Sequence, residues 1–131
     1  MKRYLLDTHV ILWWADDSDR LALRHRMLLE DTANDIYVST VSVWEASIKA
    51  ANGKLELPLP PLVFFQKVVE RYQFPVLPIH LSHAAGVFSL ARVHADPFDR
   101  LLISQARSEN MILVSEDLVF QKYDLPGLIG R

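Results

Sequence analysis

The chain has 131 residues, the usual size of one domain, and it can bury a hydrophobic core without disulfides. Half of its residues are hydrophobic and 23% are charged, which excludes a disordered or fibrous protein and favours a single compact domain over residues 1–131. Without cysteine it has no disulfide framework, thiolate metal site or cysteine nucleophile, so we expect a cytoplasmic protein. Its net charge of −2 lacks the basic field of a general nucleic-acid binder.

The first third of the chain alternates short apolar stretches with helical patterns. We predict strands at residues 3–6 and 36–38, with helices at residues 10–15 and 21–29 between them. Asp7 interrupts the first apolar stretch too early for a signal peptide or a membrane span, so no membrane association is expected.

The rest of the chain continues this alternation. A helix starts near Thr40 or Ser42, and its expected apolar face consists of Val41, Trp44, Ile48 and Ala51. The segments after it are predicted as a loop at 54–61, a helix at 62–72, an extended piece at 75–78, a helix at 82–91, a loop at 92–95, a helix at 97–108 and a buried strand at 112–114. Short strands alternating with helices favour a three-layer α/β/α sandwich around a central, mainly parallel sheet.

Acidic residues follow two of the predicted strands. In open α/β sheets the functional crevice lies beyond the carboxyl ends of the strands. Asp7 follows the first strand, and Ser115, Glu116 and Asp117 follow the strand at 112–114, so both strands deliver carboxylates to the same edge. An Asp after a strand is also an ordinary helix cap or turn former, and Asp7 taken alone leaves both interpretations open.

Two further acidic residues fall among apolar neighbours in predicted helices. Glu45 has apolar residues at helical spacing on both sides, so its side chain points either towards the core or to water at the edge of the apolar stripe. Asp99 lies three residues before Leu102, which places it on the buried side of its helix. The alternative is an ordinary helix start, with Asp96 as N-cap, Pro97 at the first position and Asp99 in the first turn.

The convergence of these acidic positions is more informative than any one of them. Four carboxylates from separate segments can meet at one edge of the sheet, where like charges repel and raise one another's pKa. Mg²⁺ or Mn²⁺ removes this conflict, because these ions prefer carboxylate oxygens and keep positions for water and substrate phosphates. The sequence therefore predicts a site for Mg²⁺ or Mn²⁺.

Other residue types indicate no second site. None of the five histidines has the paired spacing of zinc ligands, and we assign none of them to catalysis. Trp13, Trp14 and Trp44 favour core packing or a subunit interface over base stacking. Arg100 contacts either solvent or a substrate phosphate.

The acidic residues stand within four sequence motifs: Leu5-Leu6-Asp7-Thr8, Ser42-Val43-Trp44-Glu45, Asp96 to Leu102, and Leu113 to Phe120. In this order and spacing, over nearly the whole chain, they resemble the PIN-domain family, and most closely the VapC toxins of type II toxin-antitoxin pairs. The family pattern near the C-terminus is a small hydroxyl residue, any residue, an Asp and an aromatic three residues further on, which Ser115, Asp117 and Phe120 match.

The resemblance implies a PIN-like fold and an endoribonuclease that hydrolyses RNA phosphodiesters with Mg²⁺ or Mn²⁺. Four residues match the family's acidic quartet, which binds the metal and carries catalysis: Asp7, Glu45, Asp99 and Asp117. Two residues match supporting hydroxyls, Thr8 and Ser115. Asp96 and Glu116 are additional acids beside the quartet, which leaves open which member of each pair binds metal.

The same resemblance implies a toxin that inhibits translation or growth. Its partners would be RNA, a VapB-like antitoxin and a second copy of this chain in a homodimer. One alternative is a receiver-like signalling domain, which needs a lysine after a late strand that Val114, Ser115 and Glu116 do not supply. The other is a noncatalytic metal-binding module, which only an activity assay separates from the enzyme.

Overall fold

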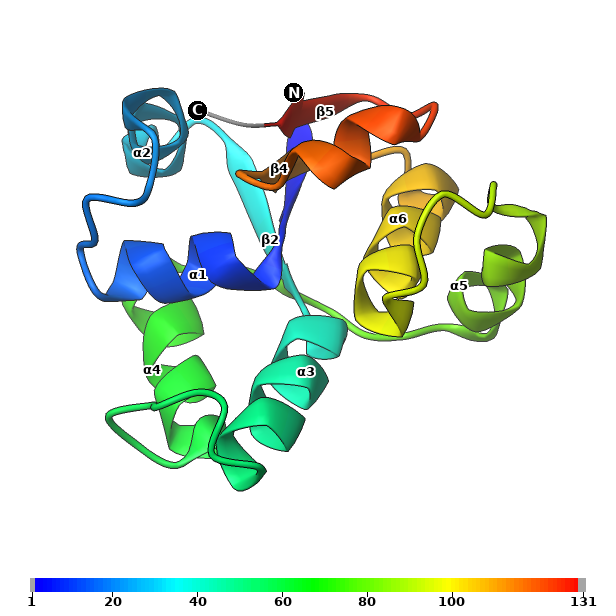
Figure 1. The fold of residues 1–131 in the computed structure, drawn as a ribbon. Helices are drawn as coiled ribbons and strands as arrows, with labels where there is room; N and C mark the ends of the chain where they lie inside the picture. The colour runs from blue at the N-terminus through cyan, green and yellow to red at the C-terminus, as the bar shows by residue number, and fades with distance from the viewer. Residues whose placement is uncertain (1, 130–131) are drawn as a thin grey trace.

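The structure is a computed structural model that describes residues 2–129 and contains one parallel sheet with helices packed around it (Figure 1). The strands lie in the order β3-β2-β1-β4-β5, with the bounds β1 (Arg3–Leu6), β2 (Asp35–Ser39), β3 (Val76–Leu77), β4 (Ile112–Ser115) and β5 (Gly127–Ile129). The helices are α1 (Thr8–Ala15), α2 (Leu23–Glu30), α3 (Thr40–Ala51), α4 (Pro61–Tyr72), α5 (Leu81–Gly86) and α6 (Pro97–Glu109), with the short 3-10 helices η1 (Val87–Ser89) and η2 (Leu118–Lys122).

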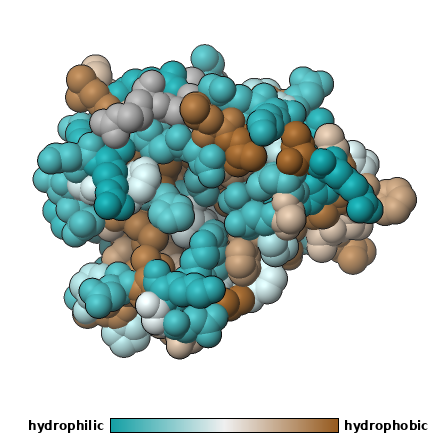
Figure 2. Space-filling model, in the orientation of Figure 1, coloured by the Kyte–Doolittle hydropathy of each residue, from teal (hydrophilic) through white to brown (hydrophobic). Residues whose placement is uncertain are grey.

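Two hydrophobic cores lie on opposite faces of the sheet, whereas the face of the molecule seen in Figure 2 is mainly hydrophilic with scattered hydrophobic residues. Successive strand residues point to opposite faces, so Leu6 packs in one core with α1 and α4, whereas Leu5 packs in the other with α6. Figure 1 shows α1 and α4 on one side of the central strands and α5 and α6 on the other. The predicted three-layer α/β/α sandwich is confirmed, and all four strand pairings are parallel.

Most predicted elements are present, with shifts of one or two residues at their ends. The helix predicted at 10–15 begins at Thr8, because Asp7 adopts an extended conformation and caps it. The next predicted cap, Thr40 or Ser42, is wrong by one residue: the hydroxyl of Ser39 accepts a hydrogen bond from the amide of Val41. The predicted capping of α6 by Asp96 is confirmed, since its carboxylate accepts from the amides of the next turn.

Three predictions about local structure were wrong or incomplete. The predicted apolar face of α3 is correct at Val41 but wrong at Trp44, Ile48 and Ala51, which are exposed. The buried side consists of Val41, Ser42, Glu45 and Ala46. The helix predicted at 82–91 ends at Gly86, whose Cα lies close against the side chain of Ser104 on α6. Neither η2 nor β5 was predicted.

The order of the strands locates the functional edge. β1 lies at the centre, the chain moves to β2 and β3 on one side of it, and β4 and β5 lie on the other side. The connections therefore diverge between β1 and β4, which is where open α/β sheets form a crevice at the carboxyl ends of their strands. No helix within residues 2–129 combines the length and the apolar character needed to cross a membrane.

We predict that the core beneath α6 dominates the stability of this arrangement. Leu102 is fully buried, so Leu102→Ala should lower the free energy of unfolding by about 2–5 kcal/mol, through lost burial and the cavity left behind. Urea unfolding followed by circular dichroism measures this change. The control is Leu23→Ala on α2, where the side chain is exposed and the change should stay within about 0.5 kcal/mol. Equal effects at the two positions would contradict the assignment of the core.

Candidate active site

Asp7 stands at the carboxyl end of β1 and is only 5% exposed. Its backbone amide donates to the carbonyl of Val114 on β4 at 2.9 Å, which extends the parallel pairing to the edge of the sheet. One carboxylate oxygen accepts from the amide of Thr8 at 2.7 Å, and the other accepts from the hydroxyl of Ser115 at 2.8 Å. Asp7 is thus a buried helix cap at the end of β1, and its functional role stays a prediction.

Ser115 connects two of the acidic positions. While its hydroxyl donates to Asp7, the same oxygen accepts from the amide of Asp117 at 3.0 Å. Asp117 is exposed, and its carboxylate accepts from the amide of Val119 at the start of η2. The turn after β4 therefore ties the backbone of Asp117 to Asp7 through Ser115 and leaves the Asp117 side chain exposed.

Glu45 reaches the same region from α3 and is 3% exposed. The hydroxyl of Thr8 lies 2.7 Å from one carboxylate oxygen of Glu45 and 2.9 Å from the hydroxyl of Ser42. The other oxygen of Glu45 pairs with the ammonium of Lys49, one turn along the helix, at 2.5 Å. Glu45 therefore points inward, which resolves the choice between core and water that its spacing left open.

Asp99 lies in the first turn of α6 and is partly buried. Its carboxylate lies 3.2 Å from Nε2 of His94, whose Nδ1 is 2.7 Å from the hydroxyl of Tyr123. Asp96 uses its carboxylate to cap α6, with bonds of 2.9 and 3.1 Å to backbone amides. Asp96 is engaged with the backbone, whereas Asp99 faces the other carboxylates.

The pKa values show that the acidic side chains act on one another. Burial first, and then the charges of Asp7, Asp96, Glu45 and Asp117, raise the pKa of Asp99 to about 8. Burial also raises the pKa of Asp7 to about 6, and Glu45 adds to this, while the hydrogen bond from Ser115 and the nearby His9 oppose it. Acidic residues from four separate segments therefore contribute to the electrostatic environment of Asp99.

The donor set suits a hard divalent cation. Carboxylate and hydroxyl oxygens are the ligands that Mg²⁺ and Mn²⁺ prefer, and a cation would remove the repulsion that raises the pKa of Asp99. Within residues 2–129, no three histidine or acidic side chains are already grouped as ligands of a single ion. The oxygen donors and the negative charge of these residues nevertheless suit such an ion.

Two candidate residues are engaged elsewhere. Glu116 turns away from Asp117: one of its oxygens accepts from the amide of Ala22 at 2.5 Å and lies 3.1 Å from Nδ1 of His25. Arg100 donates to the carbonyl of Ala91 at 2.8 Å and to the hydroxyl of Tyr123 at 3.2 Å. The roles proposed for these two side chains stay predictions, and their contacts here hold neighbouring segments in place.

Sequence reasoning missed two residues beside the carboxylates. Lys49 was not considered, although its spacing of four residues from Glu45 is a helical ion-pair signal that could have found it. His94 was assigned no role because no spacing rule connects a loop histidine to Asp99. Trp44 was expected to pack in the core or at an interface; it lies half-exposed beside Phe98, with ring centroids 4.8 Å apart.

Comparison with known proteins establishes the family. The family model of the PIN domain matches residues 4–125, and this chain belongs to the PIN-domain family. Among curated proteins it is similar to "Ribonuclease VapC22" of Mycobacterium tuberculosis, with 30% identity over 118 residues that cover 89% of this chain and 88% of that protein. Nucleases of this family generally depend on divalent metal ions.

Solved structures share the fold at low sequence identity. A chain in the crystal structure of VapBC2 from Rickettsia felis, bound to a promoter DNA fragment, has a TM-score of 0.72 at 16% identity and covers 97% of this chain and 98% of that one. A chain in a toxin-antitoxin complex from Klebsiella pneumoniae has a TM-score of 0.60 at 14% identity, covering 88% of this chain and 87% of that one. The PIN-like α/β fold predicted from the sequence is confirmed.

We predict that the raised pKa values make the protein less stable as the pH rises. Unfolded Asp ionises near pH 3.8, whereas Asp99 keeps its proton to about pH 8 and Asp7 to about pH 6. Between about pH 4 and pH 8 the folded chain binds more protons than the unfolded chain, so the free energy of unfolding falls across this window. Asp99→Asn cannot ionise and, in EDTA, should exceed the original chain in stability by roughly 1–3 kcal/mol at pH 8, with little difference at pH 4.

Urea unfolding at the two pH values measures this difference. The control is Asp124→Asn, an exposed position where the same substitution should change stability by less than about 0.5 kcal/mol at either pH. If Asp99→Asn had the same effect at pH 4 as at pH 8, ionisation of Asp99 would not be its cause.

Proposed function

We propose that this protein is a metal-dependent endoribonuclease and the toxin of a type II toxin-antitoxin pair. The observation that carries the proposal is the convergence of buried carboxylates: Thr8 bonds Asp7 through its amide and Glu45 through its hydroxyl, and both charges act on Asp99 at the start of α6. Membership of the PIN family and the likeness to a named ribonuclease support the same activity. A fold needs no such concentration of acid for stability, because mutually repelling buried carboxylates destabilise it.

Asp7, Glu45, Asp99 and Asp117 are the proposed metal ligands and catalytic residues. Mg²⁺ is the proposed ion, with Mn²⁺ able to replace it, because both favour oxygen donors. A bound divalent ion supplies a Lewis acid and an activated water for hydrolysis of the phosphodiester. The chain contributes no covalent nucleophile in this scheme, and its carboxylates hold and orient the ion.

The neighbouring polar residues fix the orientation of these carboxylates. The hydroxyl of Ser115 holds one oxygen of Asp7, and the hydroxyl of Thr8 holds one oxygen of Glu45. Hydrogen bonds of this kind orient metal ligands and commonly change metal affinity or activity 10–100-fold. Asp96 supports the site by starting α6 so that Asp99 faces the other acids.

The proposed partners follow from the relatives. A VapB-like antitoxin and a second copy of this chain are the expected protein partners in the cytoplasm, since VapBC and other toxin-antitoxin complexes share this fold. The chain is proposed to act as one nuclease domain, and the PIN match covers residues 4–125. Comparing RNA cleavage by the isolated chain with cleavage by the chain co-purified with its antitoxin tests this, because the antitoxin should suppress cleavage.

We predict RNA cleavage that requires Mg²⁺ or Mn²⁺ and depends on the acidic residues. The purified chain, free of antitoxin, is incubated with mixed structured RNA in EDTA, Mg²⁺ or Mn²⁺, beside Asp7→Asn and Asp99→Asn. Both variants should lose more than about 100-fold in rate, because a direct ligand costs more than an outer-shell partner. Asn at position 7 can still cap α1, so the first variant should remain folded.

The controls separate the enzyme from its alternative. Asp124→Asn should cleave like the original chain, and cleavage that persists in both site variants would identify a contaminating nuclease. A rise in melting temperature with Mn²⁺ but no cleavage of any RNA would favour the noncatalytic metal-binding module. Neither cleavage nor a metal-dependent rise would overturn the site itself.

A further inference from the structure

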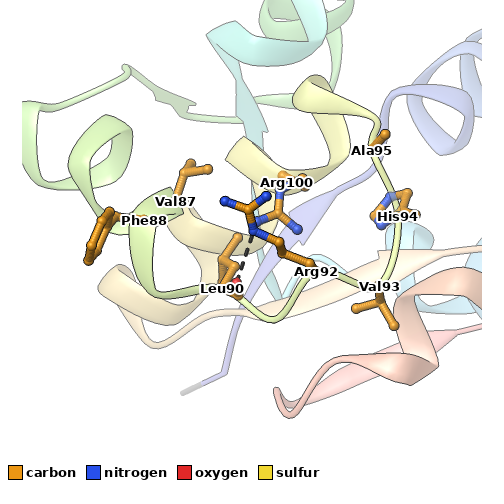
Figure 3. A pocket seen from close by; sticks show the side chains of 8 residues that line it. All are labelled: Val87, Phe88, Leu90, Arg92, Val93, His94, Ala95 and Arg100. Carbon is orange, nitrogen blue, oxygen red and sulfur yellow. Dashed lines mark hydrogen bonds between the residues drawn. The ribbon is translucent and has the colours of Figure 1, made fainter.

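A pocket of about 770 Å³ opens beside the carboxylates, between η1 and the loop that leads into α6. Its walls are drawn in Figure 3 and consist of Val87, Phe88, Leu90, Arg92, Val93, His94, Ala95 and Arg100. The predicted loop at 92–95 and the first turn of α6 thus form a hollow that the activity proposed above does not use.

The pocket is positively charged, in contrast to the acidic centre. The two arginine side chains lie in the middle of the view in Figure 3, with Phe88 on one side and His94 on the other. Arg100 is held by the carbonyls of Leu90 and Ala91. Arg92 is exposed, and within residues 2–129 no hydrogen bond or ion pair engages its guanidinium. Arg92 therefore carries a charge that is available to a ligand.

The pocket is continuous with the carboxylates through two residues. His94 forms part of its wall and lies 3.2 Å from the carboxylate of Asp99. Arg100, also in the wall, directly follows Asp99 in α6. A polymer that reaches the acidic centre can therefore extend into the pocket.

Charge and aromatic character identify the occupant. A divalent ion in the acidic centre contacts only the reacting phosphate, and the chain has no overall positive charge, so a cationic side chain beside that centre favours binding of the rest of an RNA substrate. Phe88 is 97% exposed at the edge of the pocket and offers a free aromatic face. A cation for phosphate beside an aromatic ring for a base is the combination that binds single-stranded nucleic acid.

We propose that this pocket binds the RNA nucleotide next to the cleaved bond, with Arg92 contacting its phosphate and Phe88 stacking on its base. The proposal rests on the ribonuclease activity proposed above and adds a substrate subsite to it. Arg100 and Tyr123 position the loop that carries Arg92, because Arg100 donates to both Ala91 and the Tyr123 hydroxyl. The stacking tolerates any base, so the pocket contributes affinity for single-stranded RNA more than choice of sequence.

The test measures kcat and KM for a mixed-sequence single-stranded RNA in Mn²⁺ at several salt concentrations. Arg92→Gln should raise KM about tenfold and leave kcat within about twofold, since it removes one charge-assisted contact away from the reacting bond. The slope of log KM against log salt should fall by about 0.7, the value for one lost phosphate contact with a single strand. Phe88→Leu keeps the apolar volume but loses the ring, and should also raise KM.

The matched control is Arg71→Gln, which removes the same charge from the exposed end of α4, beside Tyr72. It should leave KM and the salt slope unchanged. If RNA is cleaved but Arg92→Gln behaves like Arg71→Gln, the subsite is wrong and the proposed activity stands; if the original chain cleaves no RNA, the activity itself has failed. A change in oligomeric state on Phe88→Leu, measured by light scattering and without a change in KM, would assign the pocket to a protein interface and overturn the subsite.

Discussion

Repulsion between carboxylates gathered at one edge of the sheet is the constraint on which the site depends. Asp7 and Glu45 are nearly fully buried, and their charges together with burial raise the pKa of Asp99 to about 8. The contacts around them offset this cost: the hydroxyls of Thr8 and Ser115 donate to Glu45 and Asp7, and Lys49 forms an ion pair with Glu45. Although its partial burial disfavours the charged form, the hydrogen bond and charge of Glu45 raise the pKa of Lys49. Burial and mutual repulsion disfavour the charged form of Asp99 and Asp7, and a bound divalent cation would stabilise that charged form.

The same constraint explains which parts of the scaffold are rigid. β1 and β4 are central strands, so the turns that follow them are anchored by pairing on both sides. The start of α6 is fixed by Asp96, and the buried Gln105 of that helix lies 2.5 Å from the Ser39 hydroxyl at the end of β2. Catalytic geometry placed on such elements is more precise than geometry placed on free loops. The loop before α6, by contrast, is held mainly by Arg100 and Tyr123 and is suited to accept a substrate.

The sheet and the acidic positions could be predicted from sequence because the spacing of apolar residues is a local signal for strands and helices. Their alternation along the chain then favours a parallel sheet. Asp7 and Asp117 follow apolar strands, and parallel strands bring their carboxyl ends to one edge. The face of α3 was mispredicted because Ser42 and Glu45 are buried by contact with Thr8, and hydrophobicity alone favoured Trp44. The contacts of His94 with Asp99 and Tyr123 join a loop, a helix and a distant turn, and no spacing rule encodes them. The close approach of Gly86 to Ser104 on α6 likewise involves a partner that becomes visible only in the folded chain.

The bond between Ser115 and Asp7 joins residues 108 positions apart. During synthesis Asp7 is made long before Asp117, and β1 cannot pair with β4 until residues 112–115 have been made. An incomplete chain therefore carries some of the acids but no assembled centre. The acidic centre therefore forms only after β4 has joined the sheet, because a chain without β4 also lacks the Ser115 hydroxyl that holds Asp7.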